Sequence, residues 1–342
     1  MIIWRGSGVL SPLMIGLIIQ ASVVVVLCVG FTFTYMMEKF PNFAHTSLAT
    51  VGTVISYTLV QMYGFTPYQA LPVSTLICGL MGLVLYRFIV RPIKATGARE
   101  ITLTFAFFAL TEVIASIMYI YSYWYLYNRG TPTSGFYFFT GDFTWEGYPG
   151  VLLVAAPMCL VLVVALWFFL TKVKQGIAFR AVAEDETLAS SLGVNVEEIH
   201  LLTWFITGAL AGLAGGIIPL WRYTGLDAND EFLILVMTGS VVGGLNAVAG
   251  AVVGGLIVVV AQKLLTFIGI DFFGVGAAMY ESLYPMVLVV IILFLQPEGV
   301  MGVFDKSRPA EKRLTVRLRD SYRNLKRKAR ELREIKNTRY QR

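Results

Sequence analysis

The sequence predicts an all-α polytopic membrane protein with about eight or nine transmembrane helices and a basic C-terminal tail helix. The first observation is composition: 57% of the 342 residues are hydrophobic and 14% are charged, whereas soluble domains carry about 25% charged residues. The second is that the apolar runs are continuous rather than alternating. Only helices and closed barrels satisfy the backbone in lipid, and barrel strands alternate, so helices are predicted.

Nine apolar runs come close to the roughly 20 residues that cross a bilayer. The predicted spans are 12–36, 43–62, 67–90, 101–121, 150–170, 200–221, 232–245, 248–268 and 281–296. The run 232–245 is short, so we expect a broken or re-entrant helix there. The first run is too long for a cleavable signal peptide, and we expect it to remain as a transmembrane helix.

Lysine and arginine residues gather in three segments, and this predicts the orientation of the chain. They lie in the loop 87–99, in the polar segment 172–200 and in the tail 305–342. Because cytoplasmic loops carry an excess of these residues, nine spans place all three segments inside and the N-terminus outside. The aromatic loop 122–149 is then extracellular, where it fits the membrane interface or, alternatively, contacts an extracellular partner.

Charge divides the chain into a transmembrane domain, 1–304, and a basic cytoplasmic tail, 305–342. The tail holds 15 of the 27 Lys and Arg residues but 5 of the 21 Asp and Glu residues. The basic character is therefore local, and no nucleic-acid partner is predicted. Apolar residues of the tail repeat at helical spacing: Leu318, Tyr322, Leu325, Ala329 and Leu332. This pattern predicts an amphipathic helix that lies on anionic lipid or packs against a partner.

Glycines recur every four residues in the C-terminal half of the chain. Small residues at this spacing let helix backbones approach closely. The candidate packing glycines are Gly208, Gly212, Gly216, Gly239, Gly243, Gly244, Gly250 and Gly254. We expect packing inside one subunit, with a pore or a subunit seam as the alternative. The stretch 238–255 is predicted to form a tight helical hairpin that turns at Asn246.

The polar segment 172–200 predicts a short helix, Ala183–Leu192, held between two spans. Glu184 or Asp185 can cap its start, where acidic groups are favoured, and Gly193 predicts a left-handed end. The residues expected to share one apolar face are Leu188, Ala189 and Leu192. Such a face can enter a groove of a partner protein; a solvated loop without a partner is the alternative.

No catalytic constellation is visible in the sequence. It has no Walker A loop, no GxGxxG followed by an acidic residue, no HExxH and no nucleophile elbow. Cys28, Cys78 and Cys159 lie in separate apolar runs, and His45 and His200 are too far apart for a metal cluster. We therefore expect neither an enzyme nor a metal site, and no cofactor on this chain.

Several motifs occur together and in a recognisable order. An Arg-Ala-x-x-x-Asp run leads to a Leu-Gly-x-Asn turn, and an Ala-Gly-x-Ala-Gly helix follows. The residues are Arg180, Ala181, Asp185, Leu192, Gly193, Asn195, Ala211, Gly212, Ala214 and Gly215. Further stretches are 42–45, 90–92, the paired glycines of 243–255, and 296–299. Over about residues 12–304 the chain resembles branched-chain amino acid ABC transporter permeases, although Thr46 replaces that family's glycine.

The resemblance implies a permease subunit of an ATP-driven importer for branched-chain or related amino acids, in a prokaryotic plasma (inner) membrane. It implies four kinds of partner: a second permease in a heterodimer, two cytoplasmic ATPases carrying ATP and Mg, an extracellular solute-binding protein, and lipid. Alternatives are a permease for urea, amides or another small polar solute, and a stand-alone secondary transporter.

The resemblance also implies that the helix in the polar segment is a coupling helix seated in a cleft of the ATPase. Closure of the ATPases would push this helix and tilt the packed spans, giving alternating access. The residues implied in coupling are Arg180, Ala183, Glu184, Asp185, Leu188, Ala189, Leu192 and Gly193.

Polar residues inside the predicted spans are candidates for a translocation path. Asn42, His45 and Thr46 begin the second span, where they can line the path or cap the helix. Glu112 lies mid-span, where an ionised carboxylate costs about 2.5–3.5 kcal/mol. We expect it to face protein or water, and a stand-alone carrier would use it as its proton or cation site. Lys263 lies nearer a span end and is predicted to snorkel.

Overall fold

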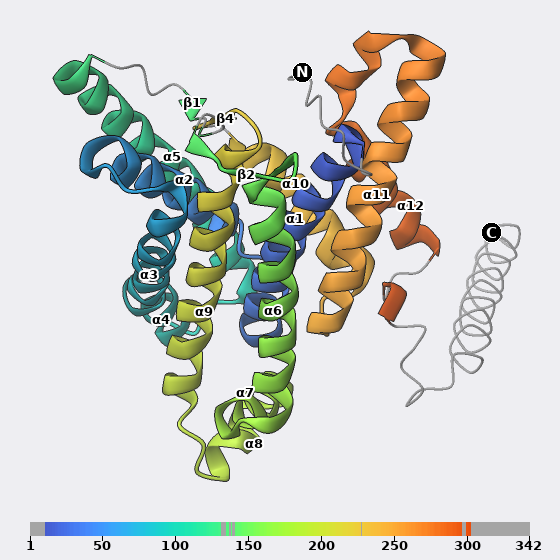
Figure 1. Ribbon diagram of the computed structural model, residues 1–342. Helices are drawn as coiled ribbons and strands as arrows, with labels where there is room; N and C mark the ends of the chain where they lie inside the picture. Colours follow the sequence, from blue (N-terminus) through green and yellow to red (C-terminus); the bar gives the residue numbers. More distant parts are fainter. Residues whose placement is uncertain are drawn as a thin grey trace, which may run out of the picture. The chain divides into compact units, whose positions relative to one another are not determined.

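The computed structural model describes residues 11–130, 135–136, 138, 141–226, 228–295 and 299–301. Helices make up most of this part of the chain (Figure 1). The predicted tail helix within 305–342, and residues 296–298 of the last motif, lie outside the described residues.

The first half of the chain holds α1 (Pro12–Glu38), α2 (Ala44–Tyr63), α3 (Pro67–Leu85), the π-helix η1 (Tyr86–Val90), α4 (Arg91–Ala95), α5 (Glu100–Arg129) and α6 (Gly150–Lys172). The second half holds α7 (Lys174–Glu184), α8 (Glu186–Ser191), α9 (Val196–Ile217), η3 (Ile218–Leu220), α10 (Ala228–Gly243), α11 (Val248–Phe273), η4 (Val275–Tyr280) and α12 (Leu283–Leu295). Two short antiparallel pairs join β1 (Gly135–Phe136) to β4 (Thr224–Gly225) and β2 (Thr144–Trp145) to β3 (Tyr148–Pro149).

Every predicted span contains a helix, and the all-helical membrane class is confirmed. Among the residues that the structure describes, six segments are long and apolar enough to cross a bilayer: 12–38, 67–95, 100–129, 150–172, 196–220 and 248–273. Shorter apolar helices cover 231–243 and 283–294, so the number of complete crossings stays a prediction. The 20-residue α2 is rich in Ser and Thr and is largely buried among its neighbours.

Helix starts follow local sequence signals. Ser11 accepts a hydrogen bond from the Met14 N–H, with Pro12 as the first helical residue of α1. Thr66 and Gln69 form a capping box at the start of α3. These side chains satisfy backbone N–H groups that have no partner inside the helix.

The loop predicted at 122–149 is shorter than expected because α5 continues to Arg129. The ring of Tyr125 packs edge-on against Tyr57 of α2 at 5.8 Å between centroids, and the Tyr121 hydroxyl lies 2.6 Å from the Thr58 hydroxyl. These contacts hold the aromatic turns of α5 in a helix. The helix ends where Gly130 adopts a left-handed conformation, φ +68°.

The centre of the bundle is α9, which packs against α1, α2 and α3. Gly208 and Gly212 lie against the backbone of α3 at Cys78 and Ser74, and Gly215 lies against the Ala49 carbonyl of α2. A Cβ atom at any of these glycines would collide with backbone, so only glycine permits the approach. Gly216 lies beside side chains of the same two helices.

The remaining predicted glycines join α10 to α11. Gly239 faces Gly255, Gly243 faces Gly250, and Gly254 lies against the Gly239 carbonyl. The two helices form the predicted tight hairpin, which turns through Gly244 at φ +104°. This contact leaves no room for a pore between α10 and α11.

Candidate functional site

The polar segment 172–200 forms two short helices beyond the ends of α6 and α9 (Figure 1). The predicted single helix Ala183–Leu192 is wrong, because Asp185 has an extended backbone (φ −151°, ψ 105°) that separates α7 from α8. Its carboxylate accepts from the Leu188 N–H at 2.9 Å and caps α8. Gly193 at φ +84° forms the predicted left-handed turn after α8.

The exposed surface of α8 carries two leucines. Leu188 is 59% exposed and Leu192 is 75% exposed, whereas Ala189 is buried with Phe33 and Phe179. The prediction that Ala189 shares the leucine face is wrong, because consecutive helical residues point about 100° apart. Of the other residues implied in coupling, Ala183 is half-buried and the following are exposed: Arg180, Glu184, Asp185 and Gly193.

A buried carboxylate, that of Glu38 at the end of α1, lies beneath α8. Its side chain is fully buried. It accepts hydrogen bonds from His200 Nδ1 and Trp204 Nε1, both at 2.8 Å, and it forms an ion pair with Lys94 Nζ at 2.5 Å. A buried charge is tolerated only when it is paired and hydrogen-bonded in this way.

His200 links this carboxylate to α8. Its Nε2 lies 3.4 Å from an Oε1 of Glu186, the first residue of α8. The Tyr86 ring stacks on the imidazole, with centroids 5.4 Å apart and planes within 10°. The Glu38 cluster, defined as Glu38, Lys94, Glu186, His200 and Trp204, therefore joins α8 to α1, α4 and α9.

A second, exposed set of ion pairs lies at the same end of the bundle. Glu197 of α9 pairs with Arg91 at 2.8 Å and with Arg87 at 3.5 Å, and all three side chains are 42–55% exposed. From the sequence, Arg87 and Arg91 served to orient the chain, and Arg91 also belongs to the motif 90–92, but neither was predicted to form these ion pairs. Glu38, His200 and Trp204 were missed as a site, because nothing in their spacing brings the end of α1 against the start of α9.

The candidate path residues at the start of α2 are buried. Asn42, His45 and Thr46 are at most 1% exposed. His45 Nε2 lies 3.1 Å from the Leu27 carbonyl of α1, and a Cβ on Gly30 would collide with the imidazole. Among the described residues, both amide atoms of Asn42, the hydroxyl of Thr46 and His45 Nδ1 have no hydrogen-bond partner. A buried polar atom without a partner costs about 1–3 kcal/mol, so these four atoms are the polar part of the candidate path.

Glu112 does not join this group. It is exposed on α5, in a helix whose exposed side chains include Phe105, Phe108 and Ile117. No described neighbour within the chain covers this carboxylate, although the sequence predicted that it would face protein or water.

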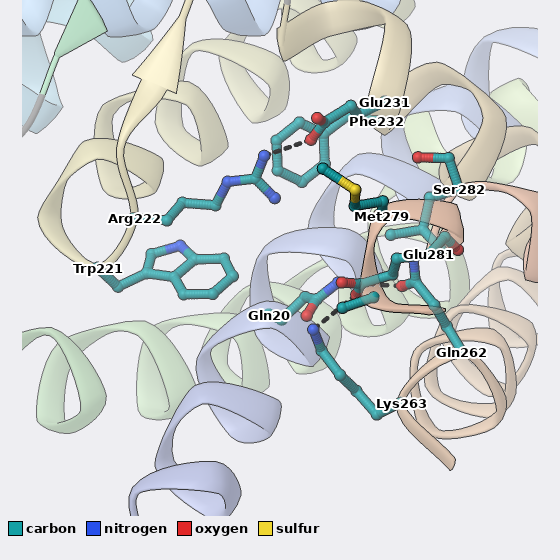
Figure 2. Close-up of a pocket in the computed structure, with 12 residues that line it drawn as sticks. Gln20, Trp221, Arg222, Glu231, Phe232, Gln262, Lys263, Met279, Glu281 and Ser282 are labelled. Carbon is teal, nitrogen blue, oxygen red and sulfur yellow. Dashed lines mark hydrogen bonds and ion pairs between the residues drawn. The ribbon is translucent and has the colours of Figure 1, made fainter. Parts of the chain in front are cut away.

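A polar pocket of about 500 Å³ is lined by Trp221 and Arg222, which follow the C-terminal end of α9, whereas α8 precedes the N-terminal end. Figure 2 shows the residues that line this pocket. Arg222, just after η3, pairs with Glu231 of α10. Lys263 of α11, predicted to snorkel, instead pairs with Glu281 at 2.7 Å. No local sequence pattern predicts these pairs, because their members belong to separate helices and connecting segments.

Comparison with known proteins decides the family. The family model described as branched-chain amino acid transport system / permease component matches residues 13–295. This chain belongs to that family. The chain is 33% identical over 288 residues to the Probable branched-chain amino acid transport permease protein LivH of Methanocaldococcus jannaschii, covering 84% of this chain and 91% of the relative.

A second member of the branched-chain permease family, the high-affinity permease protein BraD of Pseudomonas aeruginosa, is 26% identical over 81% of this chain and 90% of its own length. Among solved structures, PsaBC from Streptococcus pneumoniae in complex with Fab matches with a TM-score of 0.48 and 15% identity, covering 86% of this chain and 95% of that chain. The resemblance seen in the motifs is confirmed: the protein is a multi-pass ABC transport permease that functions with partner subunits.

Proposed function

We propose that this chain is a permease subunit that imports branched-chain or related amino acids across a prokaryotic plasma membrane. In this proposal a second permease completes the path, two cytoplasmic ATPases bind ATP and Mg, and an extracellular binding protein delivers the solute. The names of the family and of two relatives support the solute class.

The observation that carries the proposal is the surface of α8. Leu188 of α8 and Leu192 at its C-terminal cap are exposed, and Glu186 of the same helix contacts the buried Glu38 cluster. Exposed apolar side chains on a capped helix suit the groove of a partner protein. The contact of Glu186 with the Glu38 cluster suits transmission of movement from α8 to α1 and α9.

The same end of the bundle carries basic side chains, which supports a cytoplasmic location. Arg87, Arg91 and Lys94 lie beside the start of α9, and α7 and α8 follow Lys172. The positive-inside rule places such a concentration of Lys and Arg on the cytoplasmic face. Cytoplasmic ATPases would then meet α8 directly.

The mechanism follows from the contacts that α8 makes. Movement of α8 would reach α1 and α9 through the Glu186–His200–Glu38 contacts. Thr34 of α1 donates to Thr207 of α9 at 2.9 Å, so these two helices would tilt together. Since α1 also contacts His45, tilting would open or close the buried polar group at the start of α2, a form of alternating access.

Exposed Glu112 supports a second permease on the α5 face. A carboxylate facing lipid at mid-span costs about 2.5–3.5 kcal/mol, and α5 leaves large apolar side chains exposed around it. A protein partner packed against α5 would shield both the Glu112 carboxylate and these apolar side chains from lipid.

The proposal is tested by purifying the tagged chain from native membranes and identifying its partners by mass spectrometry. Two ATPase copies and a second permease are expected with the wild type. Leu188→Asp combined with Leu192→Asp is expected to lower ATPase recovery at least about tenfold, because the charges enter an apolar contact. Ser190→Asp, about 200° around α8 from Leu188, is the matched control and should retain the ATPases. Full recovery with the double variant would contradict the proposal.

A further inference from the structure

The polar pocket beyond α9 has the size and construction of a small-molecule site. Its volume of about 500 Å³ falls within the roughly 300–1,000 Å³ of such sites. Six segments supply its walls: α1, the turn after η3, α10, α11, η4 and the turn before α12 (Figure 2). A pocket built from so many segments changes shape when the bundle tilts.

Its charges are paired and balanced. Arg222 pairs with Glu231, and Lys263 pairs with Glu281. Each pair joins two different elements and is partly exposed, so a ligand carrying both charges can pair with Arg222 and with Glu281 while Glu231 and Lys263 turn toward water, and the pocket stays neutral. A single anion or a single cation cannot do this.

Two polar atoms in the pocket have no partner among the described residues. Gln20 is 3% exposed; its Nε2 donates to Gln262 Oε1 at 3.1 Å, while its own Oε1 accepts nothing. The indole Nε1 of Trp221 donates to nothing. A buried acceptor and a buried donor that are both left free indicate a ligand with a donor and an acceptor.

The free donor and the free acceptor lie in different parts of the pocket. Trp221 and Arg222 are neighbours on one wall, while Gln20 lies beside Gln262 and Glu281 (Figure 2). The Arg222 guanidinium lies 5.9 Å from the Trp221 ring centroid and 5.2 Å from that of Phe232. These aromatic faces would hold the cation in place if Glu231 turned away.

We propose that this pocket binds the transported solute as an α-amino acid zwitterion. The carboxylate accepts from Trp221 Nε1 and Arg222, and the ammonium donates to Gln20 Oε1 and Glu281. Phe232, Leu235 and Met279, which also line the pocket, contact the apolar side chain. This inference rests on the proposed import function and names the residues that recognise the solute on the side away from the ATPases.

The test measures binding of radiolabelled L-leucine to the complete transporter in nanodiscs. Arg222→Ala and Gln20→Leu are each expected to weaken leucine binding at least about tenfold, because each removes a hydrogen bond to a charged group. Arg129→Ala, at the end of α5 and outside the pocket, is the control and should bind normally. Unchanged binding in both pocket variants would overturn the proposal.

A charge exchange separates recognition from folding. The double variant Arg222→Glu with Glu231→Arg keeps an ion pair but reverses its polarity, so leucine binding should remain lost while the ATPases still co-purify. Recovery of leucine binding would show that the pair is only structural and would overturn the proposal. Displacement of bound leucine by excess acetamide would do so as well, because it would assign the pocket to neutral amides. Loss of the ATPases from the wild type would instead overturn the proposed function itself.

Discussion

The two ends of α9 use charged residues in opposite ways. In the Glu38 cluster at one end, the carboxylate is fully buried, and a histidine, a tryptophan and a lysine surround it. In the polar pocket at the other end, two ion pairs are partly exposed, and a glutamine and an indole have free polar atoms. Since α9 is 22 residues long, the two sites are separated by about 33 Å, close to the thickness of a bilayer core.

The two arrangements of charge suit two different functions. A cluster with its charge compensated resists separation of its parts, so it suits transmission of force between α8 and the spans. A site with free donors and acceptors gains when a ligand enters, so it suits recognition. Substitutions in the Glu38 cluster should therefore change the free energy of unfolding and the coupling of ATP hydrolysis to transport. Substitutions in the polar pocket should change leucine binding.

The largest expected effect is on stability, from Glu38→Gln. Removing this charge leaves Lys94 without its ion pair in a mostly buried setting, which costs about 3–5 kcal/mol. The free energy of unfolding in detergent, followed by intrinsic fluorescence, should fall by that amount. Glu197→Gln breaks a neighbouring but exposed pair and should cost about 0–1 kcal/mol. Equal losses in the two variants would remove the distinction between a buried cluster and a surface pair.

The next effect is on coupling, from Glu186→Gln. This change weakens the contact between α8 and His200 but keeps the leucine surface, so the ATPases should still bind. Leucine uptake per ATP hydrolysed, measured in proteoliposomes, should fall by about tenfold, within the range of typical coupling energies. Asp271→Asn, an exposed position on α11 away from α8, provides the control. If Glu186→Gln left the leucine uptake per ATP hydrolysed unchanged, the Glu186–His200 contact would have no part in coupling ATP hydrolysis to transport.

The sequence predicted features that depend on neighbouring residues, and it did not predict contacts between residues that are distant along the chain. Apolar length predicted a helix in each span, and Asp185 and Gly193 carry their capping chemistry in their own residue types. Ala189 was misplaced because it directly follows Leu188 and so points about 100° away, and the single helix Ala183–Leu192 was wrong because the extended backbone at Asp185 could not be read from propensity. Glu38 and His200 are 162 positions apart in the sequence. Lys263 and Glu281 are 18 positions apart, and the end of α11 lies between them. Tertiary packing alone brings such pairs together.

The smallest expected effect on the free energy of unfolding is that of a substitution in the polar pocket. Glu281→Gln breaks the Lys263 pair, in which both side chains are about one-third exposed, so it should change the free energy of unfolding by less than about 1 kcal/mol. Leucine binding should nevertheless weaken, because the ammonium loses its carboxylate. The same unfolding assay and the same binding assay in nanodiscs measure both quantities. A large loss of stability with normal binding would make this pair structural, like the Glu38 cluster, and the two ends of α9 would then no longer differ in kind.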